Sequence, residues 1–259
     1  MNEKSLIRAV DGLPVPHIIY YDEIDSTNEQ ALNLLNQGAE EFTLLVADRQ
    51  TAGRGRMGRK WVTTPGSSLA FTIILHPLES ERQKLGFFSF LGGLAVCLAI
   101  EHTCKVAPQL KWPNDVLIDR KKTAGILAES SFQGENLTGI ALGIGINLES
   151  GSVPPPDEVM FPATCIGDHC DDLTDRETFL AMVMKNLIEW RLRLLDVEFL
   201  RAYQSRLAFV GENVLLTPPS TNEIEGKLMG VDKSGYLVLE LEDGDVKAFP
   251  VGDVKLRLG

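Results

Sequence analysis

Short apolar runs alternate with a helical pattern along the N-terminal part of the chain. Strand-length apolar runs lie at residues 17–21, 42–47 and 69–75. Between the first two runs, residues 26–37 place alanine and leucine on one helical face, from a candidate N-cap at Ser26 to a stop at Gly38. The pattern predicts a strand, a helix and two further strands, the last two separated by a polar segment rich in glycine.

The middle of the chain predicts a long helix followed by several strands. Residues 82–102 contain an apolar stretch of about fourteen residues, which is shorter than the ~20 residues that a membrane-spanning helix needs. A buried helix is therefore expected. Strands are expected at residues 115–119, 124–130 and 137–148, with a tight turn at residues 120–122 that carries Lys122. A proline-rich loop at residues 150–162 and a helix at residues 176–195 follow.

The last fifty residues have a different pattern, in which single apolar positions alternate with polar ones. Turn-forming pairs, Ser234-Gly235, Asp243-Gly244 and Gly252-Asp253, recur every eight to ten residues. Alternation of this kind predicts a small barrel of about five strands that begins near Gly211. The chain thus divides into a first domain, residues 1–210, and a second domain, residues 211–259.

Composition narrows the class of protein. With 259 residues, 44% of them hydrophobic, the chain can bury a sizeable core, and its formal net charge is −11. The N-terminus lacks a basic region leading into an apolar run, so no secretory signal is expected. The acidic balance also lacks the electrostatic footprint of a DNA-binding protein. We therefore expect a globular cytoplasmic protein that binds neither DNA nor membranes.

Four cysteines, at positions 97, 104, 165 and 170, include no CxxC pair and no short spacing typical of a disulfide scaffold. Cys97 and Cys104 are expected to pack in the long helix as small hydrophobic residues. The cluster Asp168-His169-Cys170, with Cys165 nearby, could be drawn as a metal site. It lacks a second ligand pair, so no protein metal ligand is predicted. The chain is expected to be reduced.

The polar segment between the second and third predicted strands concentrates unusual chemistry. Residues 53–61 hold three glycines and four cations and end in Trp61. Cations gathered in so acidic a chain indicate an anionic ligand, although a solvated basic turn is the simpler alternative. Because glycine loses much backbone entropy on ordering, the segment is expected to be a lid that closes on its substrate. No helix follows it directly, which disfavours a dinucleotide-binding fingerprint.

Five segments in this chain resemble the motifs of biotin protein ligases. Residues 53–61 match the adenylate-binding loop GRGRxGRxW, and the other matches are STN at 26–28, KWPND at 111–115, KxAGIL at 122–127 and GxGxN at 143–147. The motifs occur in the family's order. Their number makes the resemblance specific over residues 26–147, while the C-terminal residues resemble the family in fold pattern only.

The resemblance implies a fold and a reaction. The implied fold is an α+β catalytic domain with a mixed sheet, as in class II synthetases, followed by a small SH3-like barrel. The implied reaction joins the biotin carboxylate to the α-phosphate of ATP, and the resulting biotinyl-5′-AMP then acylates a lysine of a biotin carboxyl carrier protein. Two anions brought to ~4 Å repel by about 4 kcal/mol at an effective dielectric constant near 20. Fixed positive charge is therefore required.

The resemblance also assigns residues. It implies biotin contacts from Ser26, Thr27, Asn28, Gln50, Arg54, Gly55, Arg56 and Lys122, nucleotide contacts from Arg54, Arg56, Trp61, Lys111 and Asn147, and catalytic roles for Lys122 and Arg56. Magnesium is implied by the ATP chemistry.

Several assignments leave alternatives open. Ser26 fits a helix N-cap as well as a biotin ligand, and Trp61 could anchor the loop in the core instead of stacking on adenine. Gly143 and Gly145 could mark either close ligand approach or crowded sheet positions. Asp115 could orient Lys111, accept a proton from the incoming amine, or form an ordinary ion pair.

Two rival functions compete with the biotin ligase. Lipoate ligases and octanoyl transferases are similar in fold but lack the GRGRxGRxW loop. Some biotin ligases also carry an N-terminal winged helix and act as repressors, whereas only about sixteen residues precede the first predicted strand here. The expected partner is a biotin carboxyl carrier protein, such as an acetyl-CoA carboxylase subunit, and an edge strand could support a homodimer.

Overall fold

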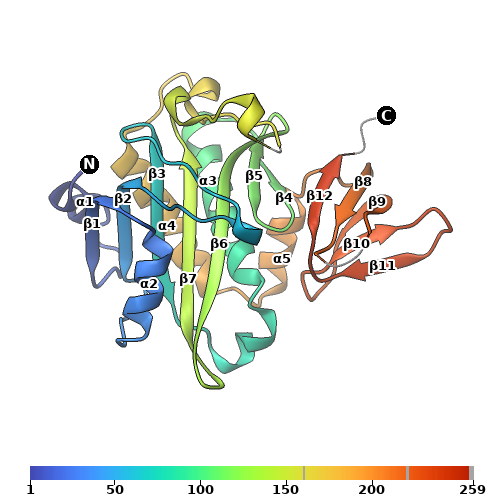
Figure 1. Cartoon of the computed structure of the whole chain (residues 1–259), viewed down its shortest axis with the longest axis horizontal. Helices are drawn as coiled ribbons and strands as arrows, with labels where there is room; N and C mark the ends of the chain where they lie inside the picture. The colour runs from blue at the N-terminus through green and yellow to red at the C-terminus, as the bar shows by residue number, and fades with distance from the viewer. Residues whose placement is uncertain (160, 220–221, 257–259) are drawn as a thin grey trace.

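A computed structural model describes residues 1–159, 161–219 and 222–256. Position 160 of the predicted loop and positions 220–221 and 257–259 of the second predicted domain lie outside the described residues. The chain forms a larger unit built on a seven-stranded sheet and a smaller unit built on a five-stranded sheet (Figure 1).

The larger sheet is mixed, with the strand order β1-β2-β3-β7-β6-β5-β4. Its strands are β1 (Ile18–Ile24), β2 (Leu44–Gln50), β3 (Ser68–Leu75), β4 (Gln109–Lys111), β5 (Asp115–Ile118), β6 (Lys121–Gln133) and β7 (Asn136–Asn147). β1 and β2 are parallel, and the other neighbours are antiparallel. The predicted strands are therefore present, and β1 extends three residues beyond the predicted end.

Two helical layers cover the sheet. The helix α2 (Thr27–Leu35) packs on one face against β2, β3, β6 and β7, whereas α3 (Phe87–Cys104) and α4 (Arg176–Arg191) lie behind the other face (Figure 1). Side chains alternate across β7, so that Leu142 and Ile144 enter the main core while Gly143 and Gly145 face α2 and the glycine-rich loop. The face that carries α2 is therefore the face of the predicted site.

The long helix starts later than predicted. Residues 82–84 belong to a 3₁₀ turn, Glu79–Lys84, and α3 begins only after Gly86. The carboxylate of Glu81 explains the difference, because it is buried and pairs with Arg191 at 2.6 Å, which fixes this segment outside the helix. By length and mean hydropathy of 1.6, α3 is apolar enough to cross a membrane, and 67% of it is buried inside the protein.

The turn after β5 differs from the prediction. Ile118 pairs with Lys121, so the turn consists of Asp119 and Arg120, both with positive φ, and not of residues 120–122. A two-residue turn of this kind matches the twist of the flanking strands. Lys122 consequently lies within β6, where the strand pairing fixes its backbone.

Two short helices, one near each end of the larger unit, were not predicted from the pattern. The predicted helix at 176–195 ends at Arg191, and after a turn a separate helix, α5 (Val197–Gln204), begins behind Asp196. A short helix, α1 (Glu3–Ala9), precedes β1 and packs on α4. Both helices are short, so their apolar patterns gave little signal.

The smaller sheet has the strand order β11-β10-β9-β8-β12. Its strands are β8 (Asn213–Thr217), β9 (Ile224–Val231), β10 (Leu237–Glu240), β11 (Val246–Phe249) and β12 (Asp253–Leu256). Within the described residues this agrees with the predicted small unit of about five strands. The unit is joined to the larger one by a hydrogen bond from Trp112 Nε1 to the Gly235 carbonyl, 3.0 Å long.

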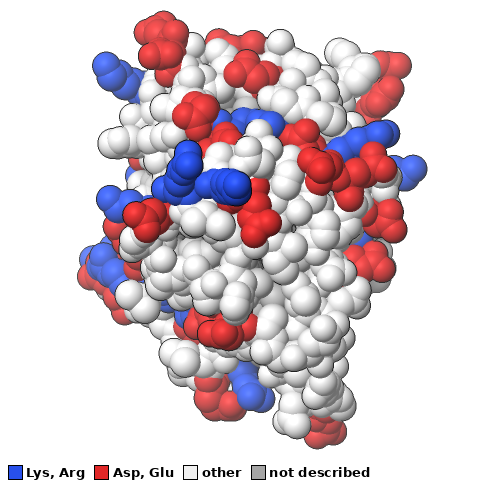
Figure 2. Space-filling view, turned by 90° about the vertical axis from the view of Figure 1, so that its left-hand side faces the viewer, with Lys and Arg blue, Asp and Glu red and all other residues white. Residues whose placement is uncertain are grey.

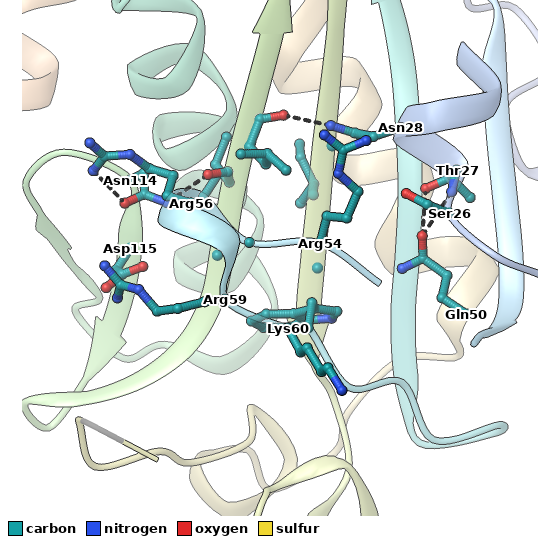
Figure 3. A pocket seen from close by; sticks show the side chains of 18 of the residues that line it. Ser26, Thr27, Asn28, Gln50, Arg54, Arg56, Arg59, Lys60, Asn114 and Asp115 are labelled. Carbon is teal, nitrogen blue, oxygen red and sulfur yellow. Dashed lines mark hydrogen bonds between the residues drawn. The ribbon is translucent and has the colours of Figure 1, made fainter. Parts of the chain in front are cut away.

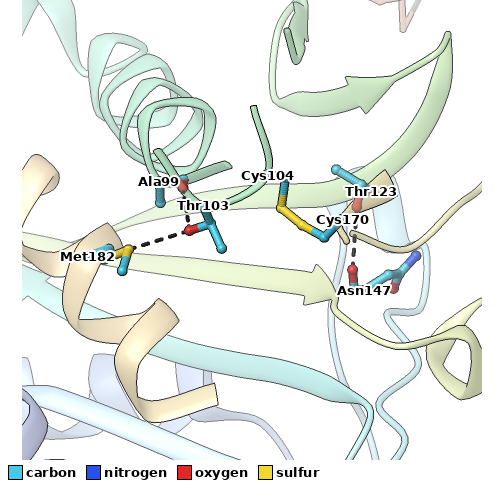
Figure 4. The surroundings of a disulfide bond; sticks show 7 residues. All are labelled: Ala99, Thr103, Cys104, Thr123, Asn147, Cys170 and Met182. Carbon is cyan, nitrogen blue, oxygen red and sulfur yellow. Dashed lines mark hydrogen bonds between the residues drawn. A yellow bond between two sulfur atoms is a disulfide. The ribbon is translucent and has the colours of Figure 1, made fainter. Parts of the chain in front are cut away.

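The prediction that Cys104 packs as a reduced, small hydrophobic residue was wrong. Cys104, at the end of α3, forms a disulfide with Cys170, with a Cα–Cα distance of 4.7 Å (Figure 4). The partners are 66 residues apart in sequence, and only the packing of α3 against the segment around Gly167–His169 brings them together. Cys97 and Cys165 are buried thiols, and burial raises the pKa of Cys97. Among the described residues no cluster of metal-ligating side chains is present.

Candidate active site

The glycine-rich loop connects β2 to β3 and crosses the sheet above β6 and β7 (Figure 3). It folds into a small hairpin in which Gly55 N donates to the Arg59 carbonyl at 2.7 Å and Trp61 N donates to the Gly53 carbonyl at 2.9 Å. Gly53 is required here, because a Cβ at this position would collide with the Trp61 carbonyl oxygen. At the tip, Met57 and Gly58 both adopt positive φ. The loop is thus anchored by sheet at both ends, as predicted.

Beneath the loop lie two adjoining cavities. The first, about 100 Å³, is lined by Ser26, Thr27, Asn28 and Gln50 together with loop residues Arg54, Gly55 and Arg56. The second, about 370 Å³, is lined by Lys111, Asn147, Phe161 and the C-terminal residues Asp253 and Lys255. Five residues border both cavities: Arg59, Lys60, Trp61, Asp115 and Lys122. Of these two volumes, only the second reaches the ~300–1,000 Å³ typical of ligand pockets.

A polar network lines the floor of the first cavity. Gln50 Oε1 accepts from Thr27 N at 2.8 Å, and the hydroxyl of Thr72 lies 2.8 Å from that of Thr27 and 2.6 Å from Asn28 Oδ1. Thr27, Asn28 and Thr72 are buried. Ser26 is the N-cap of α2, with its hydroxyl 3.5 Å from Glu29 N, and it also lines the cavity, so the two interpretations of Ser26 are compatible.

Asn28 continues the network to a carboxylate. Asn28 Nδ2 lies 3.1 Å from the Leu127 carbonyl oxygen and 2.8 Å from Glu129 Oε2. The other oxygen of Glu129 accepts from Arg54 Nη2 at 2.5 Å. Gly143 leaves the room that this arrangement needs, because a Cβ there would overlap the Asn28 amide. Crowding by a protein side chain therefore explains this glycine.

The charge centre of the site consists of two lysines that share one carboxylate. Lys111 Nζ lies 2.8 Å from Asp115 Oδ2, and Lys122 Nζ lies 2.6 Å from Asp115 Oδ1. Burial alone would raise the pKa of Asp115, but the charges of Lys122 and Lys111 outweigh it and hold that pKa well below the ordinary carboxyl range. An anion so strongly stabilised is a poor proton acceptor, so the geometry favours an orienting role for Asp115.

Arg56 extends from the loop into the site and contacts side chains of two other segments. Its Nη1 lies 3.4 Å from Asn114 Oδ1 and 3.5 Å from Asp253 Oδ1, while Arg59 also pairs with Asp253. Burial lowers the pKa of Arg56, and the nearby charge of Asp115 opposes that effect. An arginine retains its charge under these conditions. Asp253 thus ties the five-stranded unit to the loop.

Trp61 forms the wall between the two cavities. Its indole lies over Gly125 and Gly145, and a Cβ at position 145 would collide with the ring. The ammonium of Lys122 sits 5.6 Å from the ring centroid, which is a cation–π distance. The buried indole N–H has no hydrogen-bond partner among the described residues. Trp61 therefore closes the loop against the sheet while presenting its ring to the second cavity, so both proposed roles are compatible.

Asn147 ends β7 at the rim of the second cavity. It is buried, and its side-chain amide donates to the Thr164 carbonyl at 3.1 Å. The amide oxygen and the second N–H proton are thus the groups that could reach a base edge. The contact of Asn147 with a nucleotide stays a prediction, as do the ligand contacts of the other site residues.

All residues predicted for the site line at least one of the two cavities. The site predictions did not include four further residues that line the cavities, Arg59, Lys60, Asn114 and Asp253. They also missed Thr72 and Glu129, which bond to lining residues. Arg59 and Lys60 stood within the recognised loop. Glu129 follows Gly125 and Leu127 at strand spacing, which places it on the face of the site, whereas nothing in the local pattern marked Asp253.

Comparisons with known proteins agree with this arrangement. Residues 20–147 match the biotin/lipoate A/B protein ligase family, and residues 209–257 match the biotin protein ligase C-terminal domain. The biotin–[acetyl-CoA-carboxylase] ligase of Paracoccus denitrificans is 35% identical over 224 residues, which cover 83% of this chain and 90% of that protein. The bifunctional ligase/repressor BirA of Bacillus spizizenii is 34% identical over 246 residues, covering 93% of this chain and 74% of the relative.

Solved structures show the same fold. The biotin protein ligase of Aquifex aeolicus in complex with biotin and ATP superposes with a TM-score of 0.77 at 33% identity, covering 94% of this chain and 100% of that one. Fold and site together define a protein of the biotin and lipoate ligase class. Within that class, the chain belongs to the biotin protein ligase family. The predicted family and α+β fold class are confirmed.

Proposed function

We propose that the protein is an ATP-dependent ligase that forms biotinyl-5′-AMP and transfers the biotinyl group to a lysine of a biotin carboxyl carrier protein. The observation that carries the proposal is the junction of the two cavities at Lys122, Asp115 and Trp61. A carboxylate from the first cavity and a phosphate from the second would meet there, at the lysine charges that their mutual repulsion requires.

The polar floor of the first cavity favours biotin over other acids. A ureido ring carries two N–H donors and one carbonyl acceptor, and Gln50, Thr27 and Asn28, which line the cavity, carry both kinds of group. A lipoyl dithiolane or an octanoyl chain has no N–H donor or carbonyl of this kind, so neither can bond to the polar groups that line the cavity. A site built to hydrogen-bond its substrate strongly rejects analogues that lack those groups.

In the first half-reaction, the biotin carboxylate attacks the α-phosphorus of ATP and pyrophosphate leaves with the broken P–O bond electrons. Lys122 and Arg56 stabilise the charge that develops on the phosphate, while Asp115 keeps Lys111 and Lys122 in place. Magnesium would be held chiefly by phosphate oxygens and water, because two of the three carboxylates that line the cavities within the described residues, Asp115 and Asp253, are paired with cations, and Glu158 is the third.

In the second half-reaction, the neutral amine of the carrier lysine attacks the carbonyl carbon of the mixed anhydride. The new C–N bond forms as the C–O bond to AMP breaks, and the amine releases a proton to solvent. Lys122 would again stabilise the phosphate as AMP departs. Both steps use one site, because the acyl carbon stays between the two cavities throughout.

We further propose that two copies of the chain pair through the free edge of β1. In the described sheet β1 is the terminal strand and pairs only with β2, which leaves its outer edge open. The face on that side of the molecule shows acidic and basic side chains interspersed around an uncharged area (Figure 2). The cytoplasmic location and the division into domains 1–210 and 211–259 stay predictions.

The first half-reaction can be tested on its own by ATP–pyrophosphate exchange. Incubation with biotin is expected to give exchange well above background, whereas lipoate and octanoate give background rates because they have no ureido groups to bond to the polar floor. Exchange that depends on lipoate or octanoate instead of biotin would assign the chain to the rival lipoate or octanoate ligases.

A further inference from the structure

We propose that Glu129 is a positioning residue that couples closure of the glycine-rich loop to the polar floor of the first cavity. The proposal rests on the ligase function above and extends it to a residue on β6. Glu129 is the one carboxylate, among the described residues, that bonds to both Arg54 on the loop and Asn28 on α2. Its two oxygens are divided between these partners.

The hydrogen bonds form a directed chain when each donor is counted. The Thr27 hydroxyl lies 3.1 Å from Gln50 Oε1 and 2.8 Å from the Thr72 hydroxyl, and its single proton can serve one of the two. The proton of Thr72 then serves Asn28 Oδ1, which leaves the Asn28 amide protons for Leu127 and Glu129. From Thr72 through Asn28 and Glu129 to Arg54 on the loop, each contact is thereby served by its own donor.

The two ends of this series of hydrogen bonds differ in how firmly they are held. Thr72 is fully buried and Asn28 is 4% exposed, so both are held by the sheet and α2. The side chain of Arg54 is 43% exposed and belongs to a loop whose glycines make ordering costly. The rigid end therefore orients the carboxylate of Glu129, and the carboxylate fixes the guanidinium of Arg54. Ligand contacts that reorder the floor would reach the loop by this route.

This arrangement gives Arg54 a different task from the other loop cations. The guanidinium of Arg54 pairs with Glu129 and lies beside Asn28 (Figure 3), whereas Arg59 and Lys60 border both cavities. Arg54 would thus contribute to nucleotide binding by holding the loop closed. Bonds between an arginine and a carboxylate are strengthened by charge, so neutralising Glu129 should weaken closure without removing the hydrogen-bond acceptor for Asn28.

Limited trypsin cleavage of the loop tests the proposal, because Arg54, Arg56, Arg59 and Lys60 are all cleavage sites. In the presence of biotin and ATP, the loop of Glu129→Gln is expected to be cut roughly fivefold faster than that of the wild type. The matched control is Glu135→Gln, which removes the same charge from the exposed turn at the other end of the β6–β7 hairpin. Its loop should be cut at the wild-type rate, and circular dichroism should show both variants folded.

A double variant separates positioning from a general structural effect. If Glu129 acts through Arg54, adding Glu129→Gln to Arg54→Gln should leave the cleavage rate of the remaining sites unchanged, because the pair is already broken. Additive effects of the two substitutions, or wild-type protection of the loop in Glu129→Gln, would overturn the proposal. The ligase function would still stand in that case if the wild type shows biotin-dependent exchange. Wild-type protein that neither exchanges nor gains protection with biotin and ATP would refute both.

Discussion

Replacing Lys122 by glutamine is expected to lower the rate of biotin-dependent ATP–pyrophosphate exchange by about 10²–10³-fold, the loss typical of removing one transition-state stabilising group. Lys122 borders both cavities, and its ammonium group lies 2.6 Å from Asp115, which also borders both. Glutamine keeps most of the length and polarity but has no charge, so the repulsion between carboxylate and phosphate is no longer offset there. The fold should survive, because Lys122 lies on β6 with its side chain partly exposed.

The matched control for this variant is Lys121→Gln. Lys121 precedes Lys122 on the same strand, but alternation turns it away from the site and leaves it exposed. Its exchange rate should equal that of the wild type. Exchange near the wild-type rate in Lys122→Gln would show that Lys122 is an ordinary strand residue.

Replacing Asp115 by asparagine is expected to reduce both stability and activity. Lys111 and Lys122 lose their shared counterion, and Lys111 is only 7% exposed, so one ammonium group is left buried without compensation. Breaking a buried ion pair in this way costs about 3–5 kcal/mol of the free energy of unfolding. Urea unfolding at pH 7 measures this loss. Exchange activity should fall as well, because neither lysine is held in place.

The ion pairs of Asp115 with Lys111 and Lys122 also predict how the free energy of unfolding changes with pH. The pKa of Asp115 is lower in the folded than in the unfolded state, so its contribution to stability is complete above the ordinary carboxyl pKa of ~3.9. The contribution is lost as the pH falls from there toward the folded-state pKa. The stability difference between wild type and Asp115→Asn should therefore be constant near neutral pH and shrink in acid.

Asp119→Asn serves as the control for Asp115→Asn. The side chain of Asp119 is 79% exposed, and asparagine tolerates its positive φ. Its free energy of unfolding at pH 7 should stay close to that of the wild type. Equal stability of Asp115→Asn and Asp119→Asn would contradict a buried charge centre.

The sequence predicted the features of the site that depend on local patterns. The apolar runs of β2 and β3 bracket the glycine-rich loop, and the resemblance indicated Lys111, Lys122 and Asn147, which the structure brings to the second cavity. Alternation also identified the small C-terminal unit. Short-range periodicity and turn chemistry determine such elements, so a single sequence is enough to expect them.

Features that depend on contacts between distant segments were not predictable from these patterns. Asp253 reaches Arg56 and Arg59 only because the five-stranded unit packs beside the loop, and Cys170 reaches Cys104 only through the packing of α3. The late start of α3 likewise follows from the pairing of Glu81 with Arg191, more than a hundred residues away. Tertiary contacts of this kind override local propensity.

The most direct measurement of the ligase function is the intact mass of a purified biotin carboxyl carrier domain after incubation with the protein, ATP and either biotin or octanoate. The function predicts that the carrier gains the mass of one biotinyl group, that the gain requires ATP, and that a carrier whose acceptor lysine is replaced by arginine gains nothing. Octanoate should leave the carrier unchanged. A carrier that is acylated by octanoate and not by biotin would contradict the account.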